Sequence, residues 1–329
     1  MKKVMLSPDE AAALIKTGRF LALAADEAIL RRLPVGNWIG GTIPYFIGEQ
    51  GGLQSRELVY ITDLAEASCA ATIVDYTSAS MPNIAKDAPE NGYTVLIIPA
   101  LSALHSEYAA NAHDYDGLFM KPIVGWISGV HLDDLGKVSP KVINGKTGAI
   151  SDSKAVAIHV PLPENQLAVV RILNLFHQGD GDVLTFPKVG FTASDCLVNG
   201  KPANFAQYAK EHSLDLARPL VADYNGAQIN VSFQSVDAEK QQVDFYAPVF
   251  TGVEYKQAAP VGDYVEEFGT LVCGIHVHAH FACNCMLNFL YGKLDGRKTG
   301  ELTGPVTFGE IGYQLLNQTL VYLEIIKTH

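Results

Sequence analysis

The sequence lacks the long apolar run that a membrane-spanning helix requires. No uninterrupted apolar segment among the 329 residues approaches the roughly 20 residues that cross a bilayer. The first residues, MKKVMLSPDEAAAL, include two lysines, but the apolar stretch of a signal peptide does not follow them. We therefore expect a cytoplasmic protein that does not have a membrane as a partner.

Clusters of basic residues are also missing. Lys and Arg number 24 against 35 Asp and Glu, so the formal net charge is −11, and no basic run interrupts it. Proteins that bind a phosphate backbone usually carry a basic patch, so we do not expect nucleic acid as a partner. Hydrophobic residues make up 48% and charged residues 18% of the chain, which is the balance of an ordinary globular protein.

Motifs for nucleotide binding and nucleophilic catalysis are absent. The sequence contains neither a GxGxxG fingerprint nor a GxxxxGK[ST] phosphate loop nor a G-x-S-x-G turn. We therefore expect no nucleotide cofactor, and a binding protein rather than an enzyme. An odd number of cysteines argues against a disulfide framework and favours reduced, mostly buried thiols. The five are Cys69, Cys196, Cys273, Cys283 and Cys285.

Short apolar runs alternate with helical segments in the first half of the chain. Ser7-Pro8-Asp9-Glu10 has the residues of a capped helix start, and Gly18 is suited to end that helix. A further helix is predicted over residues 103–113. This alternation predicts a mixed α/β fold. The predicted strands are FLALAAD (20–26), LVYITDL (58–64), TVLIIPAL (94–101), PIVGWISGV (122–130) and AVAIHVPL (155–162).

The second half of the chain is richer in strand patterns. The polar, glycine-rich QGDGD segment indicates a break, and we place a domain boundary between residues 185 and 186. After it, Asn199-Gly200 predicts a tight hairpin turn, and PANFAQYAKEH predicts a helix with Pro202 near its start. Residues 229–250 alternate polar and apolar side chains around a charged turn, which is typical of an antiparallel hairpin.

A glycine-rich segment and a histidine-rich segment are the main site candidates. Residues 36–52 contain six glycines, which serve either as turn residues or as a loop that lets a ligand approach the backbone. In GIHVHAHFACNCML (274–287), His276, His278 and His280 alternate and two cysteines follow. Histidines two apart on a strand share one face and can share one zinc ion, which motivates a metal-dependent enzyme as the alternative function.

Strand parity separates the cysteines of this segment from the histidines. In a continuous strand the histidines share one face, whereas Cys283 and Cys285 share the opposite face with apolar residues. The cysteines are therefore predicted to pack in the core and could join the histidines at one ion only through a bulge. Apart from metal binding, the histidines are expected to be solvated, to be hydrogen-bonded, or to line an organic-ligand pocket.

The C-terminal pattern resembles the C-terminal domain of FIST-type sensory proteins. That family pairs a Phe-x-Cys segment with a downstream Gly-Glu-Ile-Gly and an Asn-x-Thr in the last strand. Here the counterparts are Phe281 and Cys283, then residues 309–312, then Asn317 and Thr319. More loosely, residues 40–42 and Gly48-Glu49 are similar to a loop of the FIST N-domain. The chain resembles a divergent member over residues 30–325, with Met286 where many members have arginine.

The resemblance implies two related halves with mixed, largely antiparallel sheets flanked by helices, a FIST-N-like domain over 1–185 and a FIST-C-like domain over 186–329. It further implies a cytoplasmic sensory protein that binds a small ligand, such as an amino acid or a similar metabolite, and passes a signal to a separate protein. The ligand-binding residues would be Gly40, Gly41, Thr42, Cys283, Gly309, Glu310, Gly312 and Asn317.

Glu310 and its flanking glycines also have a physical interpretation of their own. Gly309 and Gly312 would let a ligand come close to the backbone while the carboxylate faces a cationic group such as an α-ammonium. The alternative is a glycine bulge with Glu310 as a surface charge, and Asn317 as a residue that satisfies a neighbouring loop. In the metal hypothesis, His276 and His278 are the ligands and zinc is the ion.

Overall fold

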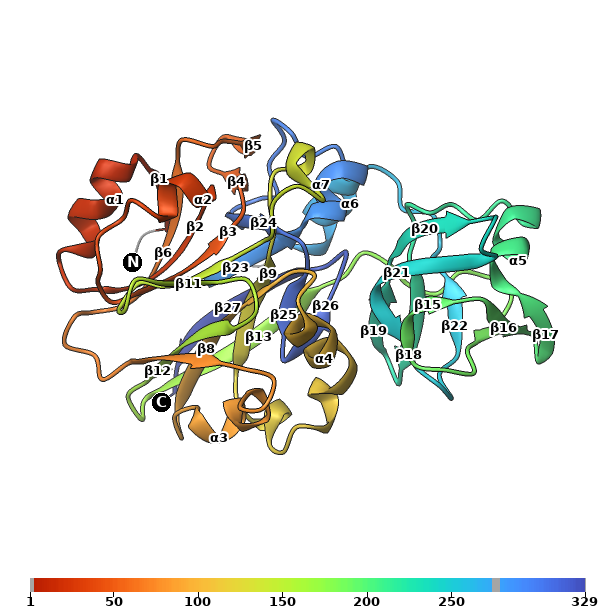
Figure 1. The fold of residues 1–329 in the computed structure, drawn as a ribbon, viewed down its shortest axis with the longest axis horizontal. Coiled ribbons are helices and arrows are strands. Elements are labelled where there is room, and N and C mark those ends of the chain that lie inside the picture. The colour runs from red at the N-terminus through yellow and green to blue at the C-terminus, as the bar shows by residue number, and fades with distance from the viewer. Residues whose placement is uncertain (1–2, 274–278, 329) are drawn as a thin grey trace.

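A computed structural model describes residues 3–273 and 279–328. The chain forms two lobes of unequal size, and both termini lie in the larger one (Figure 1). The chain leaves the large lobe after strand β13 (Gln166–Leu173) and returns at helix α6 (Tyr264–Leu271). The smaller lobe, drawn in green to cyan in Figure 1, is formed by the residues between these two elements. It is therefore an insertion into the large lobe.

The first sheet of the large lobe has the strand order β1-β6-β2-β3-β10-β11, in which only the β2–β3 pair is parallel. Helices α1 (Pro8–Ile15) and α2 (Glu27–Leu30) pack on it through one apolar cluster. The strands are β1 (Lys3–Leu6), β2 (Phe20–Ala25), β3 (Trp38–Thr42), β6 (Val59–Ala65), β10 (Val142–Asn144) and β11 (Ala149–Ser151).

The second sheet has the order β26-β25-β9-β8-β12-β7, again with a single parallel pair, β8–β9. Helices α3 (Ile84–Asp87) and α4 (Ala103–Asn111) pack on one of its faces, with the 3-10 turns η1 (Met81–Asn83), η2 (Ala112–Asp114) and η3 (Leu118–Met120) beside them. The strands are β7 (Thr72–Tyr76), β8 (Gly92–Pro99), β9 (Ile123–Ser128), β12 (Ala155–Pro161), β25 (Glu310–Gly312) and β26 (Gln314–Leu316).

These two sheets pack face to face between outer layers of helices. In β2, Leu21 and Leu23 contact the helix side while Ala22 and Ala24 enter the central core. The same alternation directs Leu96 of β8 toward helices α3 and α4, whereas the residues on either side of it in the strand lie in the central core. Both faces of the central strands are therefore buried, which explains why they read as continuous apolar runs.

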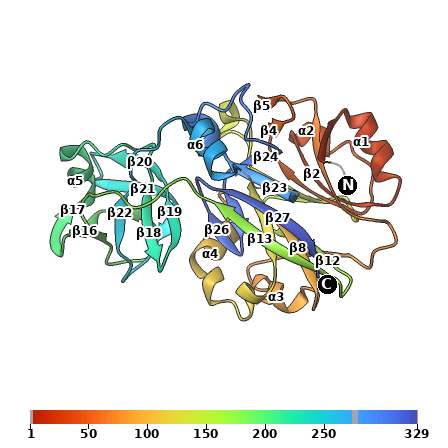
Figure 2. The ribbon, with the colours of Figure 1, turned by 180° about the vertical axis from the view of Figure 1, so that it is seen from behind.

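A third sheet joins sequence segments from the two ends of the chain. Its order is β13-β27-β23-β24-β4-β5, and β13, β27 and β23 lie side by side in Figure 2. Helix α7 (Met286–Tyr291) follows β23 directly. The remaining strands are β4 (Tyr45–Gly48), β5 (Gly51–Gln54), β23 (Ala279–Cys285), β24 (Gly304–Thr307) and β27 (Leu320–Lys327), and a short turn, η4 (Leu132–Asp134), follows β9.

The small lobe consists of two antiparallel sheets and helix α5 (Phe205–Glu211) around an aromatic core. Phe186, Phe205, Phe233 and Phe245 contact one another in that core. The strands are β14 (Leu184–Thr185), β16 (Asp195–Val198), β17 (Lys201–Asn204), β18 (Leu220–Tyr224), β19 (Ala227–Val231) and β22 (Tyr255–Gln257) in one sheet, and β15 (Gly190–Ala193), β20 (Phe233–Asp237) and β21 (Gln242–Val249) in the other.

The mixed α/β fold predicted from the sequence is confirmed, together with several local features. The Ser7 hydroxyl accepts from Glu10 N at 3.4 Å and a Glu10 carboxylate oxygen accepts from Ser7 N at 2.9 Å, so the capping box is formed. Asn199 and Gly200, with φ of 47° and 79°, form the predicted hairpin turn between β16 and β17. Pro202, however, lies in β17 and not in the following helix, which begins at Phe205.

The domain boundary predicted between residues 185 and 186 does not match the strand pairing. C-terminal strands β24, β25 and β27 pair with β4, β9 and β13, which precede the boundary. The polar QGDGD segment does mark the entry into the small lobe, but the chain later returns to the large one. The glycine-rich segment 36–52 is likewise not a loop, because most of it forms β3, β4 and the start of β5.

Candidate ligand-binding cleft and the predicted site

Glu310 is buried in the large lobe and is hydrogen-bonded to Thr319, two residues from Asn317. Strand β25 places it opposite Leu316 of β26, and its Oε2 accepts hydrogen bonds from Thr319 N at 3.2 Å and Thr319 Oγ1 at 2.8 Å. The side chain is completely buried, so the prediction of a surface charge is wrong. Burial in a low-dielectric environment raises the pKa of Glu310 to about 8, despite these hydrogen bonds.

Cys285 lies against the Glu310 carboxyl group at the end of β23. Its thiol is buried, and both this burial and the nearby carboxyl raise its pKa well above the usual value. A thiol held in its neutral form is a poor nucleophile. Cys283, the other cysteine of the segment, is also buried and donates to the Gly125 carbonyl at 3.2 Å. The prediction that both cysteines pack in the core is confirmed.

Asn317 connects the large lobe to the small one. Its Oδ1 accepts from Ser232 N at 3.0 Å and from Ser232 Oγ at 2.7 Å, and Ser232 follows strand β19 of the small lobe. Asn230 Nδ2 donates to the carbonyls of Asn317 and Gln318 at 3.1 and 3.3 Å. Asn317, Asn230 and Ser232 therefore form a buried hydrogen-bonded junction between the lobes.

The predicted glycines have packing roles in this structure. A Cβ on Gly41 would lie 2.6 Å from Trp126 Nε1 and 2.7 Å from Ile97 Cγ2. At Gly309 the nearest atoms would be side-chain carbons of Ile127 and Leu315, both at 3.0 Å. Gly40 and Gly312 are crowded in the same way by apolar side chains. These four glycines let strands and side chains approach each other, and the prediction that they approach a ligand is not supported by their surroundings.

Thr42 lies apart from Glu310, at the end of β3. Its hydroxyl donates to the Gly129 carbonyl at 2.7 Å and accepts from Lys141 N at 2.8 Å. The eight predicted ligand-binding residues therefore do not gather around one cavity. Asn317 lies at the lobe junction and Glu310 bonds to Thr319 of the same segment, whereas Thr42 ties the end of β3 to neighbouring backbone.

The histidine segment is described only from Ala279 onward. His276 and His278, the predicted metal ligands, lie outside the described residues. His280 is buried beside Tyr93 Oη at 2.6 Å and the Leu64 carbonyl at 3.0 Å. The described part of the chain contains no group of three or more His, Cys, Asp or Glu side chains arranged to hold a metal ion. Zinc binding by His276 and His278 stays a prediction.

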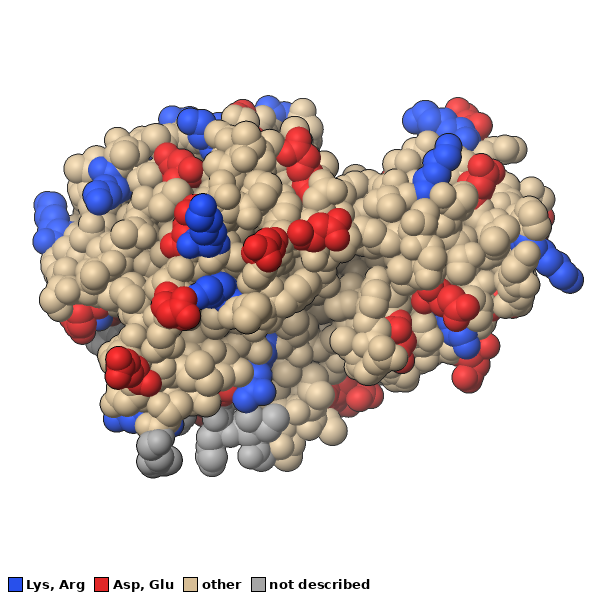
Figure 3. All heavy atoms as spheres, turned by 90° about the horizontal axis from the view of Figure 1, so that it is seen from below, with Lys and Arg blue, Asp and Glu red and all other residues tan. Residues whose placement is uncertain are grey.

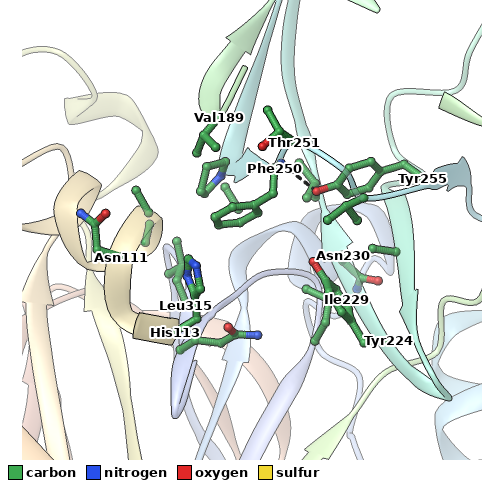
Figure 4. Close-up of a pocket in the computed structure, with 18 of the residues that line it drawn as sticks. Asn111, His113, Val189, Tyr224, Ile229, Asn230, Phe250, Thr251, Tyr255 and Leu315 are labelled. Atoms are coloured by element: carbon green, nitrogen blue, oxygen red, sulfur yellow. Dashed lines mark hydrogen bonds between the residues drawn. The ribbon is translucent and has the colours of Figure 1, made fainter. Parts of the chain in front are cut away.

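A cleft of about 780 Å³ lies between the two lobes. Figure 4 shows Asn111, His113 and Leu315 facing Tyr224, Ile229 and Asn230 across it, and Figure 3 shows the hollow between the lobes from another side. The large lobe contributes Ala109, Ala110, Asn111, His113, Asp114, Phe119, Gln314 and Leu315, and the small lobe contributes Val189, Ala222, Tyr224, Ala227, Ile229, Asn230, Val231, Ala247, Pro248, Phe250, Thr251, Val253 and Tyr255.

Local structure fixes the walls of this cleft. Ser102 caps helix α4 by accepting from His105 N at 3.0 Å, and the end of this helix carries Asn111 to the cleft. Across the cleft, Phe250 N donates to Tyr255 Oη at 2.9 Å, which holds the segment after β21 against β22. The rings of His113 and Phe250 meet edge to face between the lobes, with centroids 5.1 Å apart.

A family model matches residues 6–326, which is nearly the whole chain. The chain belongs to DUF6976, a family of unknown function. Comparisons with curated proteins and with solved structures found no match for this DUF6976 chain. The likeness to FIST-type proteins stays a prediction. None of the described helices of the DUF6976 chain has the length and apolar character needed to cross a membrane.

Sequence reasoning did not find the cleft of this DUF6976 protein. Its lining comes from five separate stretches of chain, and most of its residues are ordinary apolar side chains in strands. Tyr224 ends a strand next to the Asn225-Gly226 turn and is 47% exposed, but this exposure is a property of the folded chain that the sequence does not show.

Proposed function

We propose that this DUF6976 protein is a binding protein that holds a small molecule in the cleft between its lobes. The observation that carries the proposal is the cleft itself, because its volume of about 780 Å³ is within the range of sites that hold drug-sized ligands. Its lining also has the usual character of such sites, with apolar walls and a few polar groups.

The cleft is suited to a sensory role because each lobe supplies one wall. A ligand that contacts both walls favours the arrangement of lobes in which those contacts form, and so shifts the population of arrangements. The chain crosses between the lobes twice, and Phe176, Val221 and Ala258 pack together at the crossing. We infer that a separate signalling protein recognises the ligand-bound arrangement.

The polar junction beneath the cleft supports the same idea. Asn230 lines the cleft and also donates to the carbonyls of Asn317 and Gln318 in the large lobe. Its Oδ1 accepts from Asn174 Nδ2 at 2.9 Å, close to where the chain enters the small lobe. A ligand beside Asn230 would therefore act on a residue that already joins the two lobes.

A thermal-shift screen of small metabolites tests this proposal. A ligand present at 100 times its Kd stabilises the folded protein by about 2.7 kcal/mol, which raises the melting temperature by several degrees. Thr251→Trp fills the cleft from an exposed position and should abolish the shift. The control is Gln207→Trp, at an exposed site of α5 that does not line the cleft, and it should keep the shift.

Two results of this screen would count against a binding role for the cleft. A broad library without any stabilising compound would remove the reason to treat the cleft as a binding site. Stabilising compounds that act equally on wild type and on Thr251→Trp would place binding elsewhere in the molecule.

A further inference from the structure

The charged and aromatic side chains of the cleft limit the chemical class of ligand that it can bind. This inference rests on the proposed function. We propose that the cleft selects an uncharged or cationic molecule with a planar ring and rejects anions. Amino acids, the ligand class implied by the FIST resemblance, carry a carboxylate and fall outside this class unless that group points away from the cleft.

The described residues of the cleft walls offer no Lys or Arg as a partner for an anion. The only carboxylate among them is that of Asp114. His113 Nε2 lies 3.6 Å from Asp114 Oδ1, so the imidazole already has an acidic neighbour. The net charge of −11 adds a repulsive field for anions over the whole chain. A carboxylate or phosphate entering the cleft would lose water without gaining a partner.

Aromatic faces are available on both sides of the cleft. Phe119 of the large lobe is 55% exposed and Tyr224 of the small lobe is 47% exposed, so part of each ring can be reached by a ligand. His113 and Phe250 meet edge to face across the cleft with an interplanar angle of 88°. A planar ligand can stack on such faces, and a cationic ligand gains further attraction from the ring quadrupole.

Three polar side chains of the cleft can form hydrogen bonds to a ligand and so fix its orientation. In the described part of the chain, the side chains of Tyr224, Thr251 and Gln314 make no hydrogen bond to another residue. Asn230, by contrast, is committed to the lobe junction. The free groups offer both donors and acceptors, which suits amide-like edges of an uncharged ring compound.

Three fragments of the same shape test the charge preference. Benzamidine, benzamide and benzoate differ in charge but share a planar ring of similar size, and ligand-observed NMR detects their weak binding. We expect binding of benzamidine and benzamide that is lost in Thr251→Trp, and no binding of benzoate. Binding of benzoate in the cleft as tight as that of benzamide would overturn the inference, as would the absence of cleft-dependent binding by all three fragments.

A charge-neutralising variant gives a second readout. Asp114→Asn should weaken benzamidine by about twofold to fivefold and leave benzamide unchanged, because Asp114 is exposed and its attraction is screened. Asp152→Asn, an exposed acidic residue away from the cleft, should change neither fragment. Equal weakening of benzamidine by both variants would contradict a role for Asp114. Failure of the proposed function can be told apart from failure of the charge preference. If the cleft binds nothing, the metabolite screen yields no cleft-dependent ligand of any charge.

Discussion

Glu310→Gln is the substitution whose effect follows most directly from the structure. The Glu310 side chain is completely buried, and burial raises its pKa from 4.5 to about 8. The folded protein therefore retains a proton that the unfolded chain releases above pH 4.5. The contribution of the Glu310 carboxyl group to the free energy of unfolding is fully present below pH 4.5 and is lost as the pH rises toward about 8.

The size of this effect follows from the shift itself. At 1.36 kcal/mol per pH unit, a change from 4.5 to about 8 corresponds to roughly 5 kcal/mol of unfolding free energy. Gln has nearly the shape of the neutral acid, and its carbonyl can accept from Thr319 N as Glu310 Oε2 does. Cys285 and Tyr264, the titratable groups that face Glu310, have raised pKa values and stay neutral over this range.

Urea unfolding of both proteins between pH 5 and pH 9 measures the difference. We expect the unfolding free energy of wild type to fall through this range relative to Glu310→Gln, so that the variant is the more stable protein at pH 9. Glu254→Gln, at an exposed position, is the control and should follow wild type. Parallel pH profiles for wild type and Glu310→Gln would show that position 310 does not hold a buried neutral carboxyl group.

Two further substitutions test the packing and the junction. Gly41→Ala should lower the free energy of unfolding, measured in urea, by about 1–3 kcal/mol, because its Cβ would lie 2.6 Å from Trp126 Nε1. Gly181→Ala is the control, since its Cβ would meet open space and the change should be nearly neutral. Equal effects of the two substitutions would show that Gly41 is not crowded. Ser232→Ala removes the hydroxyl that donates to Asn317 Oδ1 at 2.7 Å, so it should lower the free energy of unfolding by about 1–3 kcal/mol. It should also speed the hydrogen exchange of residues 317–319. Unchanged exchange there would contradict a hydrogen-bonded junction between the lobes.

The fold was predictable where local pattern determines structure. The helix start at Ser7, the turn at Asn199-Gly200 and the apolar strands all follow from short-range preferences of a few residues. The insertion of the small lobe was not predictable in this way. It depends on pairing between segments far apart in sequence, such as β4 with β24, and no local pattern specifies those partners.

The site was predictable only in part, for a related reason. The segment around Glu310 and Asn317 does hold buried polar groups that interact, but its partners Ser232 and Asn230 belong to the small lobe. The glycines of β3 and β25 gave a misleading signal, because close approach of a side chain requires glycine as much as close approach of a ligand does. The cleft has no motif, since its apolar residues look like any others in strands.

Soaking crystals with a library of small fragments shows whether the cleft between the lobes binds small molecules. We expect electron density for uncharged or cationic ring fragments between Leu315 of the large lobe and Phe250 of the small lobe. Crystals in which the cleft is open to solvent, and in which fragments bind elsewhere while the cleft stays empty, would contradict this expectation.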